Sequence, residues 1–356
     1  MEDQPLITII LPTYQRPLML KRAIQSVLNQ TYPNYQVCIY DNASGDQTAS
    51  VVKNLITSGA NIRYHRHLTN IGMLENFQYG LKRVDTPFFL FLCDDDIILP
   101  GFFEKALEGF EAHPDAQFSS GLAAYTDTRR VTEVNPQGVV GYLEPPESLL
   151  SMITGNFTHP VLGATLFRRE VIAEFGYWDL ATGPLGVDVD YMFRIMAHRP
   201  VVISSTPYAI RVNHPSSATV MHDYDHYWPG WLKIIQNLSD DERIPTHIQT
   251  QIKDTLTHHV TSSLLSIGYN NVRNGRLDSA SKSAELLRDY FRLEEESEAL
   301  YKYINLRKDH EILFNLKNLQ QQIFSLMQIR TQFVYLRRKR ELQEKYGNYL
   351  QYLQAL

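Results

Sequence analysis

The chain has 356 residues, of which 44% are hydrophobic and 21% are charged, and its formal net charge at pH 7 is -5. This length suggests two or three structural units, and the apolar content is ample for a packed core. A net negative charge gives no global attraction to nucleic acid, so nucleic acid is not an expected partner.

The cysteines and the first residues bear on the compartment. Cys38 and Cys93 each lie in an apolar segment typical of a core strand, which predicts packing residues in a reducing compartment rather than a disulfide framework. Residues 1–5 (MEDQP) lack the basic start of a signal peptide, and no segment supplies about 20 uninterrupted apolar residues. We therefore expect a cytoplasmic protein, or one bound peripherally at the inner face of a membrane.

Strands and helices are predicted to alternate over residues 1–100. Residues 6–12 are β-branched and end at Pro12, and residues 18–29 have apolar side chains at helical spacing. The same patterns predict strands at 35–40, 61–65 and 87–93 and helices at 48–58 and 75–84. This alternation favours a mostly parallel, Rossmann-like central sheet with flanking helices, so the polar loops after the strands should converge on one edge.

The pattern becomes mixed after residue 100 and purely helical near the end. Helices are predicted at 102–112, 147–154 and 189–197, and strands at 116–125 and 163–167. From residue 224 the strand signals vanish, and Gln, Asn, Lys, Arg, Glu and Leu dominate. We expect an α/β unit over residues 1–223, divided into halves 1–100 and 101–223, followed by an all-helical C-terminal module over residues 224–356.

The most informative segment is residues 88–100 (FFLFLCDDDIILP), an apolar run that leads into Asp94, Asp95 and Asp96. A run of this kind suits a strand buried on both faces, which puts the acids at its C-terminal end, where open α/β sheets bind ligands. Adjacent carboxylates repel one another, and Mg²⁺ or Mn²⁺ commonly bridges such oxygens to substrate phosphates. The triplet therefore predicts a divalent metal and a diphosphate-containing substrate, with a solvated strand end as the alternative.

Polar loops follow the other predicted strands. They are residues 12–17 (PTYQRP), 41–46 (DNASGD) and 70–72 (NIG). Tyr14 can stack on a base, Asp41 can accept a hydrogen bond from a base N–H or a sugar hydroxyl, and Arg16 or backbone N–H groups can bind diphosphate oxygens. Taken singly, each residue also fits a core aromatic, a helix cap or a simple turn.

The order of these loops and the acidic triplet resembles the nucleotide-sugar site of family 2 glycosyltransferases, which have the GT-A fold. The resemblance extends over residues 6–220 and implies that residues 1–100 form the nucleotide-sugar half and residues 101–223 the acceptor half. It further implies that the donor is bound by Pro12, Tyr14, Arg16, Asp41, Asn70, Gly72, Asp94, Asp95 and Arg211.

The family's metal-binding signature, Asp-x-Asp, corresponds to Asp94 and Asp96 with Asp95 between them. The resemblance implies that Asp96 is a direct ligand and that Asp94 or Asp95 binds the ribose or the metal's water shell. Many relatives have an acid where this chain has Cys93, which leaves the roles of the three Asp residues open.

A second acidic motif lies at residues 186–194 (GVDVDYMFR) and resembles the start of the helix that borders the acceptor site in the family. It implies that Asp188 is the catalytic base, although Val187 replaces the Glu often found before it. Inverting transfer needs a carboxylate to remove the acceptor's proton while a metal stabilises the departing diphosphate. The alternative is that Asp188 merely caps the helix.

Residues 208–219 (YAIRVNHPSSAT) resemble the segment that closes the family's core domain. The resemblance implies that Arg211 neutralises the pyrophosphate and that His214 is a third metal ligand, with a turn residue as the alternative for His214. His159 and Trp178 are candidates for the acceptor pocket, and core packing is the equal alternative for Trp178. Residues 222–226 (HDYDH) fit a lid or linker.

The leading hypothesis is an inverting glycosyltransferase that uses Mn²⁺ or Mg²⁺. It would move a sugar from a UDP-sugar, with a dTDP-sugar as the second choice, to a hydroxyl of a glycan or lipid-linked glycan in bacterial surface polysaccharide synthesis. A nucleotidyltransferase is disfavoured because residues 12–17 contain no Gly for a triphosphate-binding loop. An inactive sugar-binding or scaffold protein is disfavoured because the acidic motifs and His214 are all present.

The helical module carries two further features. Residues 312–326 have apolar side chains at alternating spacings of four and three, which is a short heptad stripe suited to a homo-oligomer contact. Residues 335–340 (YLRRKR) form a basic cluster beside aromatic and Leu side chains, which could rest on an anionic membrane surface. A solvated helix face is an equally good interpretation of the basic cluster.

Overall fold

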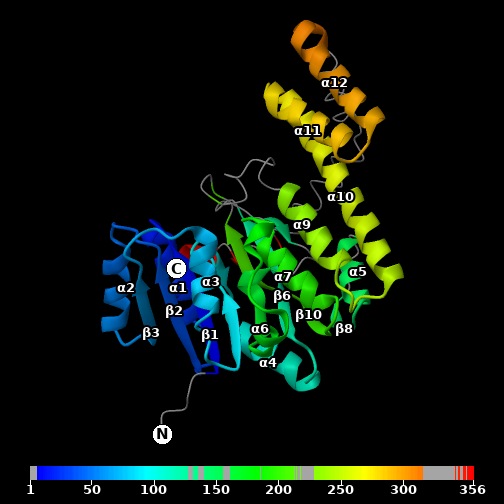
Figure 1. Cartoon of the computed structure of the whole chain (residues 1–356). Coiled ribbons are helices and arrows are strands. Elements are labelled where there is room, and N and C mark those ends of the chain that lie inside the picture. The colour runs from blue at the N-terminus through cyan, green and yellow to red at the C-terminus, as the bar shows by residue number, and fades with distance from the viewer. Residues whose placement is uncertain are drawn as a thin grey trace.

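A computed structural model describes residues 6–126, 131–134, 140–154, 161–184, 186–212, 214, 217, 228–315, 341, 344, 348, 349 and 351–356. Within these residues a single ten-stranded sheet forms the centre of the molecule, as Figure 1 shows. Its strands are β1 (Ile7–Thr13), β2 (Tyr35–Asp41), β3 (Ile62–Arg66), β4 (Phe88–Phe91), β5 (Ile97–Ile98), β6 (Phe118–Thr126), β7 (Val131–Val134), β8 (Gly141–Leu143), β9 (Thr165–Arg168) and β10 (Val201–Val212).

The strand order is β3-β2-β1-β4-β9-β6-β10-β5, with β7 beside β6 and β8 beside β10. Strands β1 to β4 are parallel, and β1 lies between β2 and β4. The direction in which the sheet grows therefore reverses between β1 and β4. Open α/β sheets bind ligands in the crevice outside the carboxyl ends of the strands at such a point.

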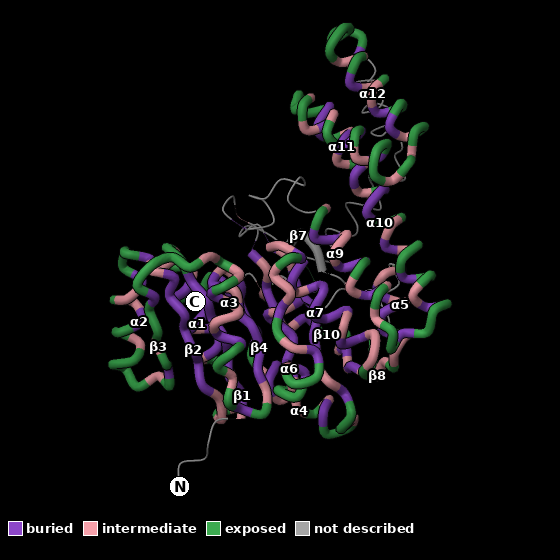
Figure 2. Tube along the Cα trace, viewed as in Figure 1, coloured by how far each residue is buried: buried purple, intermediate pink, exposed green. Residues whose placement is uncertain are grey.

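Helices cover both faces of the sheet because strand side chains alternate between the faces. One apolar cluster joins the sheet to α1 (Pro17–Leu28), α2 (Thr48–Thr57) and α4 (Phe102–Ala112). The other joins it to α3 (Met73–Leu81), α5 (Glu147–Ile153), α6 (Glu170–Phe175) and α7 (Val187–Met196). Figure 2 shows the strands of the sheet mostly buried between these layers. The predicted α/β class with flanking helices is confirmed.

The second half of the sheet is mixed. Strand β9 runs antiparallel to its neighbours β4 and β6, and β10 runs parallel to β6 but antiparallel to β5 and β8. The sequence analysis assigned no strand to the start of β10. The reason is the irregular stretch between Ile203 and Ala209, where the pairing register shifts twice and Pro207 cannot donate a ladder hydrogen bond.

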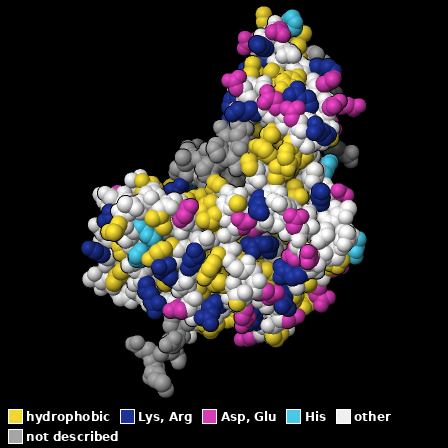
Figure 3. Space-filling view, in the orientation of Figure 1, with side chains coloured by type: hydrophobic (Ala, Val, Ile, Leu, Met, Phe, Trp, Pro, Cys, Tyr) yellow, Lys and Arg dark blue, Asp and Glu magenta, His cyan; other side chains and the backbone are white. Residues whose placement is uncertain are grey.

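The helical C-terminal region consists, in the described residues, of α9 (Trp228–Ser239), α10 (Thr246–Arg273), α11 (Leu277–Asp289) and α12 (Glu294–Asp309). Helix α9 packs on the α/β unit so closely that a Cβ at Gly230 would lie 2.0 Å from the carbonyl oxygen of Thr182. The later helices project away from the sheet (Figure 1). Figure 3 shows charges of both signs interspersed over the visible face of this projection.

No helix in the described part of the chain is long and apolar enough to cross a membrane. The predicted oligomer stripe at 312–326 is described only up to residue 315, where Ile312 is 80% exposed and Phe314 is buried. The basic cluster at 335–340 lies outside the described residues. The membrane and oligomer contacts therefore stay predictions.

Residues 348, 349 and 351–356 return to the sheet. Leu353 is 4% exposed and forms an apolar cluster with Ile97 and Leu99, which lie in and just after β5, and with Ile210 and Val212 of β10. The hydroxyl of Tyr349 donates to the carbonyl oxygen of Pro207 at 3.5 Å. Figure 1 accordingly places the C end near α1, far from the tip of the helical projection.

Candidate functional site

The loops after β1, β2 and β3 are hydrogen-bonded to one another. The N–H of Gln15 donates to Oγ of Ser44 at 2.9 Å, which joins the first two loops. Nδ2 of Asn42 donates to Oδ1 of Asn70 at 2.9 Å and to the carbonyl oxygen of Gly72 at 3.0 Å, which joins the third. Three of the predicted donor loops therefore form one connected rim at the same edge of the sheet.

Asp41 shapes this rim from inside. Its side chain is 1% exposed and accepts hydrogen bonds from the hydroxyl of Tyr64 at 2.5 Å and from the N–H and hydroxyl of Ser44 at 2.9 and 2.6 Å. Buried carboxylates are retained where such donors satisfy them. The arrangement makes Asp41 a support of the loop as well as a candidate contact to the donor.

Other predicted donor residues take distinct places. Tyr14 is 41% exposed beside the crevice, as stacking on a base would require, whereas Pro12 is buried within β1. Gly72 has φ of 99°, and a Cβ there would lie 2.2 Å from a carboxylate oxygen of Glu75. The positive φ explains why glycine occupies the position, because the Glu75 carboxylate is the end of a flexible side chain that can move away.

The acidic triplet lies in the crevice between β1 and β4. Asp94 accepts hydrogen bonds from Oγ1 of Thr13 at 2.7 Å and from Nη1 of Arg16 at 3.0 Å. The same nitrogen of Arg16 donates to Oδ2 of Asp95 at 3.1 Å. In the sequence, Asp94 lies 81 residues after Thr13 and 78 residues after Arg16. Side chains therefore join two loops that are distant along the chain.

Strand β10 and its following residues bring positive charge and a histidine to the triplet. Nε of Arg211 lies 3.8 Å from Oδ2 of Asp96, and the backbone N–H of Val212 also donates to the Asp96 carboxylate. Nε2 of His214 lies 2.9 Å from Oδ2 of Asp95. The structure therefore brings together Arg16, Arg211, His214 and the three acids, all of which the sequence analysis selected.

The raised pKa values of Asp94 and Asp96 indicate that the triplet has too little positive charge around it. Burial, followed by the charge of Asp95, raises the pKa of Asp94 to about 6. Burial also raises the pKa of Asp96, and Arg211 only partly offsets it. Carboxylates in this situation are readily stabilised by a bound cation.

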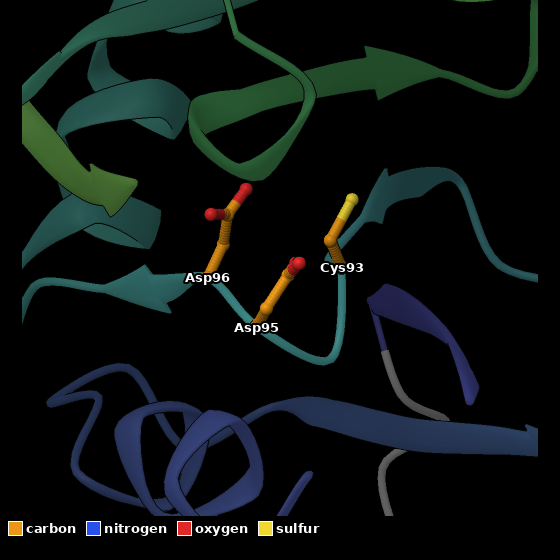
Figure 4. A group of neighbouring side chains, drawn as sticks. All are labelled: Cys93, Asp95 and Asp96. Atoms are coloured by element: carbon orange, nitrogen blue, oxygen red, sulfur yellow. The ribbon is translucent and has the colours of Figure 1, made fainter. Parts of the chain in front are cut away.

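Three side chains form a group that could hold a metal ion. One ligand atom each from Cys93, Asp95 and Asp96 lies within 4.8 Å of the others, and Figure 4 shows the three side chains in the turn that links β4 to β5. Burial, followed by the charges of Asp96 and Asp95, raises the pKa of the Cys93 thiol, which keeps it protonated and a poor ligand. The oxygens of Asp95 and Asp96 suit Mg²⁺ or Mn²⁺.

Among the predicted metal ligands, Asp94 has the surroundings that suit metal binding least. Both of its oxygens accept hydrogen bonds, from Thr13 and Arg16, and it is absent from the group of atoms within mutual reach of one ion. The geometry thus favours Asp95 with Asp96 over Asp94 with Asp96. The ligand set itself stays a prediction.

The two acids of the second motif differ in their partners. In the described part of the chain, the Asp188 carboxylate accepts a hydrogen bond only from the N–H of Val189, at 2.9 Å. Asp190 is 0% exposed and accepts from Nε of Arg194 at 2.8 Å and from Nδ2 of Asn237 at 2.9 Å. Asp190 is therefore committed to holding the structure, and Asp188 retains the capacity to accept a proton.

The acceptor-pocket candidates have different outcomes. Trp178 is 4% exposed and packs against Phe91 and Phe77, with ring centroids 4.6 and 5.2 Å away, so its core-packing alternative describes it. His159 and residues 222–226 lie outside the described residues.

Sequence analysis missed Asn237 of α9. Its side-chain nitrogen donates to Asp179, which caps a short 3₁₀ helix, η2 (Leu180–Thr182), and to Asp190 on α7. The local sequence carried no signal for this role, because the partners are 58 and 47 residues away. A residue of the helical region thereby supports the helix that carries Asp188.

Replacing Asn237 with Ala should lower the free energy of unfolding by about 2 kcal/mol, because Asp190 and Asp179 would each lose a donor. Urea unfolding measures this loss. The matched control is Gln236→Ala, which changes the exposed neighbour and should lie within about 0.5 kcal/mol of the wild type. Equal stability of the two variants would contradict the supporting role.

The metal-free protein should show a specific pH dependence at Asp94. Because the folded pKa of about 6 exceeds the ordinary value of 3.8, the folded state binds more protons than the unfolded state between these pH values. The stability of the wild type relative to Asp94→Asn should therefore fall by about 3 kcal/mol as the pH rises from about 4 to about 7. Urea unfolding in EDTA across this range measures it.

The control for this pH series is Asp254→Asn, which removes an exposed carboxylate on α10. The raised pKa of Asp94 would be contradicted if the stability of Asp94→Asn relative to the wild type rose as the pH fell, or did not change with pH.

The comparisons with known proteins agree with this fold. The family model described as "Glycosyl transferase family 2" matches residues 8–176, which include β1, β4 and the acidic triplet. Residues 8–176, which are 169 of the 356 residues, are therefore similar to family 2 of the glycosyltransferases. The α/β fold that the sequence analysis expected agrees with this class.

Two curated relatives have names that describe glucosyl transfer to an undecaprenol-linked glycan and teichoic acid biosynthesis. The chain is 34% identical over 111 residues to the GalNAc(5)-diNAcBac-PP-undecaprenol beta-1,3-glucosyltransferase of Campylobacter jejuni, which covers 30% of this chain and 36% of that protein. It is 31% identical over 108 residues to the minor teichoic acid biosynthesis protein GgaB of Bacillus subtilis, covering 30% of this chain and 12% of that protein. The matched segment thus spans about a third or less of these two relatives.

Solved structures share the fold over most of the chain. The structure of S. aureus TarS 1-349 in complex with UDP-GlcNAc has a TM-score of 0.61 at 14% identity, covering 86% of this chain and 92% of that chain. The mannosyltransferase PcManGT of Pyrobaculum calidifontis in complex with GDP-Man and Mn²⁺ has a TM-score of 0.51 at 15% identity, covering 89% and 85%. At such identities the likeness concerns the fold alone.

Proposed function

We propose that the protein is an inverting, metal-dependent glycosyltransferase. It transfers a sugar from a nucleoside-diphosphate donor, with UDP-sugars favoured and dTDP-sugars as the second choice, to a hydroxyl of a glycan or lipid-linked glycan in bacterial surface polysaccharide synthesis. The observation that carries the proposal is the meeting of Arg16, Arg211, His214 and the acidic triplet in the crevice between β1 and β4. The surface-glycan setting is supported by the curated relatives.

The donor's nucleotide fits the β1 side of the crevice. Tyr14, exposed at the rim, offers a ring for stacking on the base, and the hydrogen-bonded loops that contain Asp41, Asn70 and Gly72 border the same edge. Arg16 and Arg211 flank the acids from β1 and β10 and suit the diphosphate, since guanidinium groups pair well with phosphate oxygens.

A divalent metal would be held by Asp96 and Asp95, with His214 beside them, and Asp94 as the alternative ligand. When bound, Mn²⁺ or Mg²⁺ supplies a Lewis acid that stabilises the charge of the departing nucleoside diphosphate. The raised pKa values of Asp94 and Asp96 support this role, because burial leaves these acids in need of positive charge. The Arg16 side chain meanwhile orients Asp94 and Asp95.

Asp188 takes the role of the base. It would remove the proton of the acceptor hydroxyl as that oxygen attacks the anomeric carbon and the bond from this carbon to the diphosphate oxygen breaks. The support is that Asp188 begins a buried helix whose other acid, Asp190, is fixed by Arg194 and Asn237. This helix places one proton acceptor on a rigid element, as an oriented general base requires.

The test is thermal unfolding of the full chain with UDP, GDP, dTDP or CMP, each with and without Mn²⁺. A ligand at about 100 times its Kd adds about 2.7 kcal/mol, which raises Tm by roughly 2 °C or more in a chain of this size. We expect the shift with UDP and Mn²⁺ together. No shift with any nucleotide would favour the scaffold alternative, and pyrophosphate release from UTP would favour a nucleotidyltransferase.

A further inference from the structure

An apolar face of β5 and β10 is covered by residues 348–356. Ile97, Leu99, Ile210 and Val212 are each 1–7% exposed and cluster with Leu353. Tyr349, Tyr352 and Leu356 pack around this cluster. The opposite face of β5 points elsewhere, because Ile98 belongs to the cluster beneath α1.

The covered strands are the ones that carry the acidic and basic groups of the candidate site. Ile97 directly follows Asp96, and Val212 lies between Arg211 and the segment that leads to His214. Val212 also links the two strands, since its N–H donates to the Asp96 carboxylate while its side chain contacts the Leu353 cluster.

On the side away from β10, β5 pairs with no other strand among the described residues. It has two residues, and it pairs with β10 through Ile97 with Ile210 and Ile98 with Ala209. In addition, the N–H of Leu99 donates to the carbonyl oxygen of Tyr208 at 2.7 Å, and the N–H of Ile98 donates to Oγ of Ser26 at 3.2 Å. Nε2 of Gln30 donates to the carbonyl oxygen of Leu99 at 2.8 Å. A strand this short depends on side-chain packing to keep its place.

We propose that Leu353, supported by Tyr349 and Tyr352, is a positioning residue of the metal and diphosphate end of the site. It touches neither substrate nor metal. It holds β5 against β10 so that Asp96, Arg211 and His214 converge, and loss of this cover separates them. The inference rests on the proposed function, because it assumes that this convergence binds a metal and a nucleoside diphosphate.

The test compares Leu353→Asp with Gln354→Asp, which adds the same charge at the exposed neighbouring position. Calorimetric titration with UDP in Mn²⁺ should show an affinity about 10- to 100-fold weaker for Leu353→Asp, the usual effect of losing a support of a metal site. Gln354→Asp should stay within about twofold of the wild type, and the conservative variant Leu353→Met should recover most of the affinity.

Hydrogen exchange of the unliganded variants separates a local effect from general unfolding. In Leu353→Asp, the amides of residues 96–99 and 209–212 should exchange faster, while those of β1 and β2 should keep wild-type protection. As a second variant, a chain ending at residue 347 should regain UDP binding saturably when a peptide of residues 341–356 is added.

The outcomes are distinguishable. If the wild type binds no nucleotide with Mn²⁺, the proposed function fails and the positioning role fails with it. If the wild type binds and Leu353→Asp binds equally well, the positioning role alone is overturned. Faster exchange throughout the sheet, with no recovery by the peptide, would also overturn it, because the segment would then serve only general stability.

Discussion

Replacing Asp188 with Asn should reduce kcat for sugar transfer by about 10³-fold, because an amide cannot take the proton of the acceptor hydroxyl. Binding of UDP in Mn²⁺ should be unchanged, since Asp188 lies on α7 and makes none of the contacts of the β1–β4 crevice. Initial rates of UDP release from the sugar donor with acceptor present, together with calorimetry for UDP, measure both quantities.

The matched control is Asp190→Asn on the same turn of α7. Asp190 is fully buried between Arg194 and Asn237, so losing its charge should lower the free energy of unfolding by about 3 kcal/mol. An Asp188→Asn enzyme that kept more than about a tenth of wild-type kcat would contradict the assignment of the base.

The second large effect is expected at Asp96. Changing Asp96 to Asn should weaken UDP binding in Mn²⁺ by about 100-fold, because the metal loses a charged ligand in a buried site. The metal-free variant should at the same time be more stable than the wild type at pH 8, since burial raises the pKa of Asp96 and makes its charge costly. Calorimetry and urea unfolding measure these opposite changes.

Comparison with Asp94→Asn and Asp95→Asn resolves the ligand set. The geometry predicts that Asp95→Asn resembles Asp96→Asn in its loss of Mn²⁺-dependent binding, whereas Asp94→Asn loses less. The Asp-x-Asp resemblance predicts instead that Asp94→Asn is the closer match. Equal affinity of all three variants with and without Mn²⁺ would contradict a metal at this site.

The α/β fold was predictable because its signals are local. Strands β1, β2 and β4 are short apolar runs that end in polar loops, and each helix between them shows helical spacing. The convergence of the loops follows from parallel strands whose C-terminal ends share one edge of the sheet. This is why the acids, Arg16 and the loop residues could be selected together from the sequence.

The remaining features depend on contacts that leave no local trace. The start of β10 was missed because its middle is irregular and contains Pro207. Asp94 and Asp95 differ in their surroundings because Thr13 donates to Asp94 while Arg16 also donates to Asp95, and the sequence does not reveal these contacts. The role of Asn237 depends on the packing of α9 against α7. The segment that contains Leu353 covers β5, although Leu353 lies more than 250 residues after Ile97 in the sequence.

The return of residues 348–356 to the sheet has a topological consequence. Because Leu353 and its neighbours pack on β5 and β10, helices α9 to α12 lie in the sequence between two segments that both contact the sheet. Cutting the chain after residue 227 would therefore remove part of the catalytic domain together with the helices. A shortened version that keeps these contacts has to retain α9, whose Asn237 supports α7, together with the segment that contains Leu353, and a linker would replace the projecting helices.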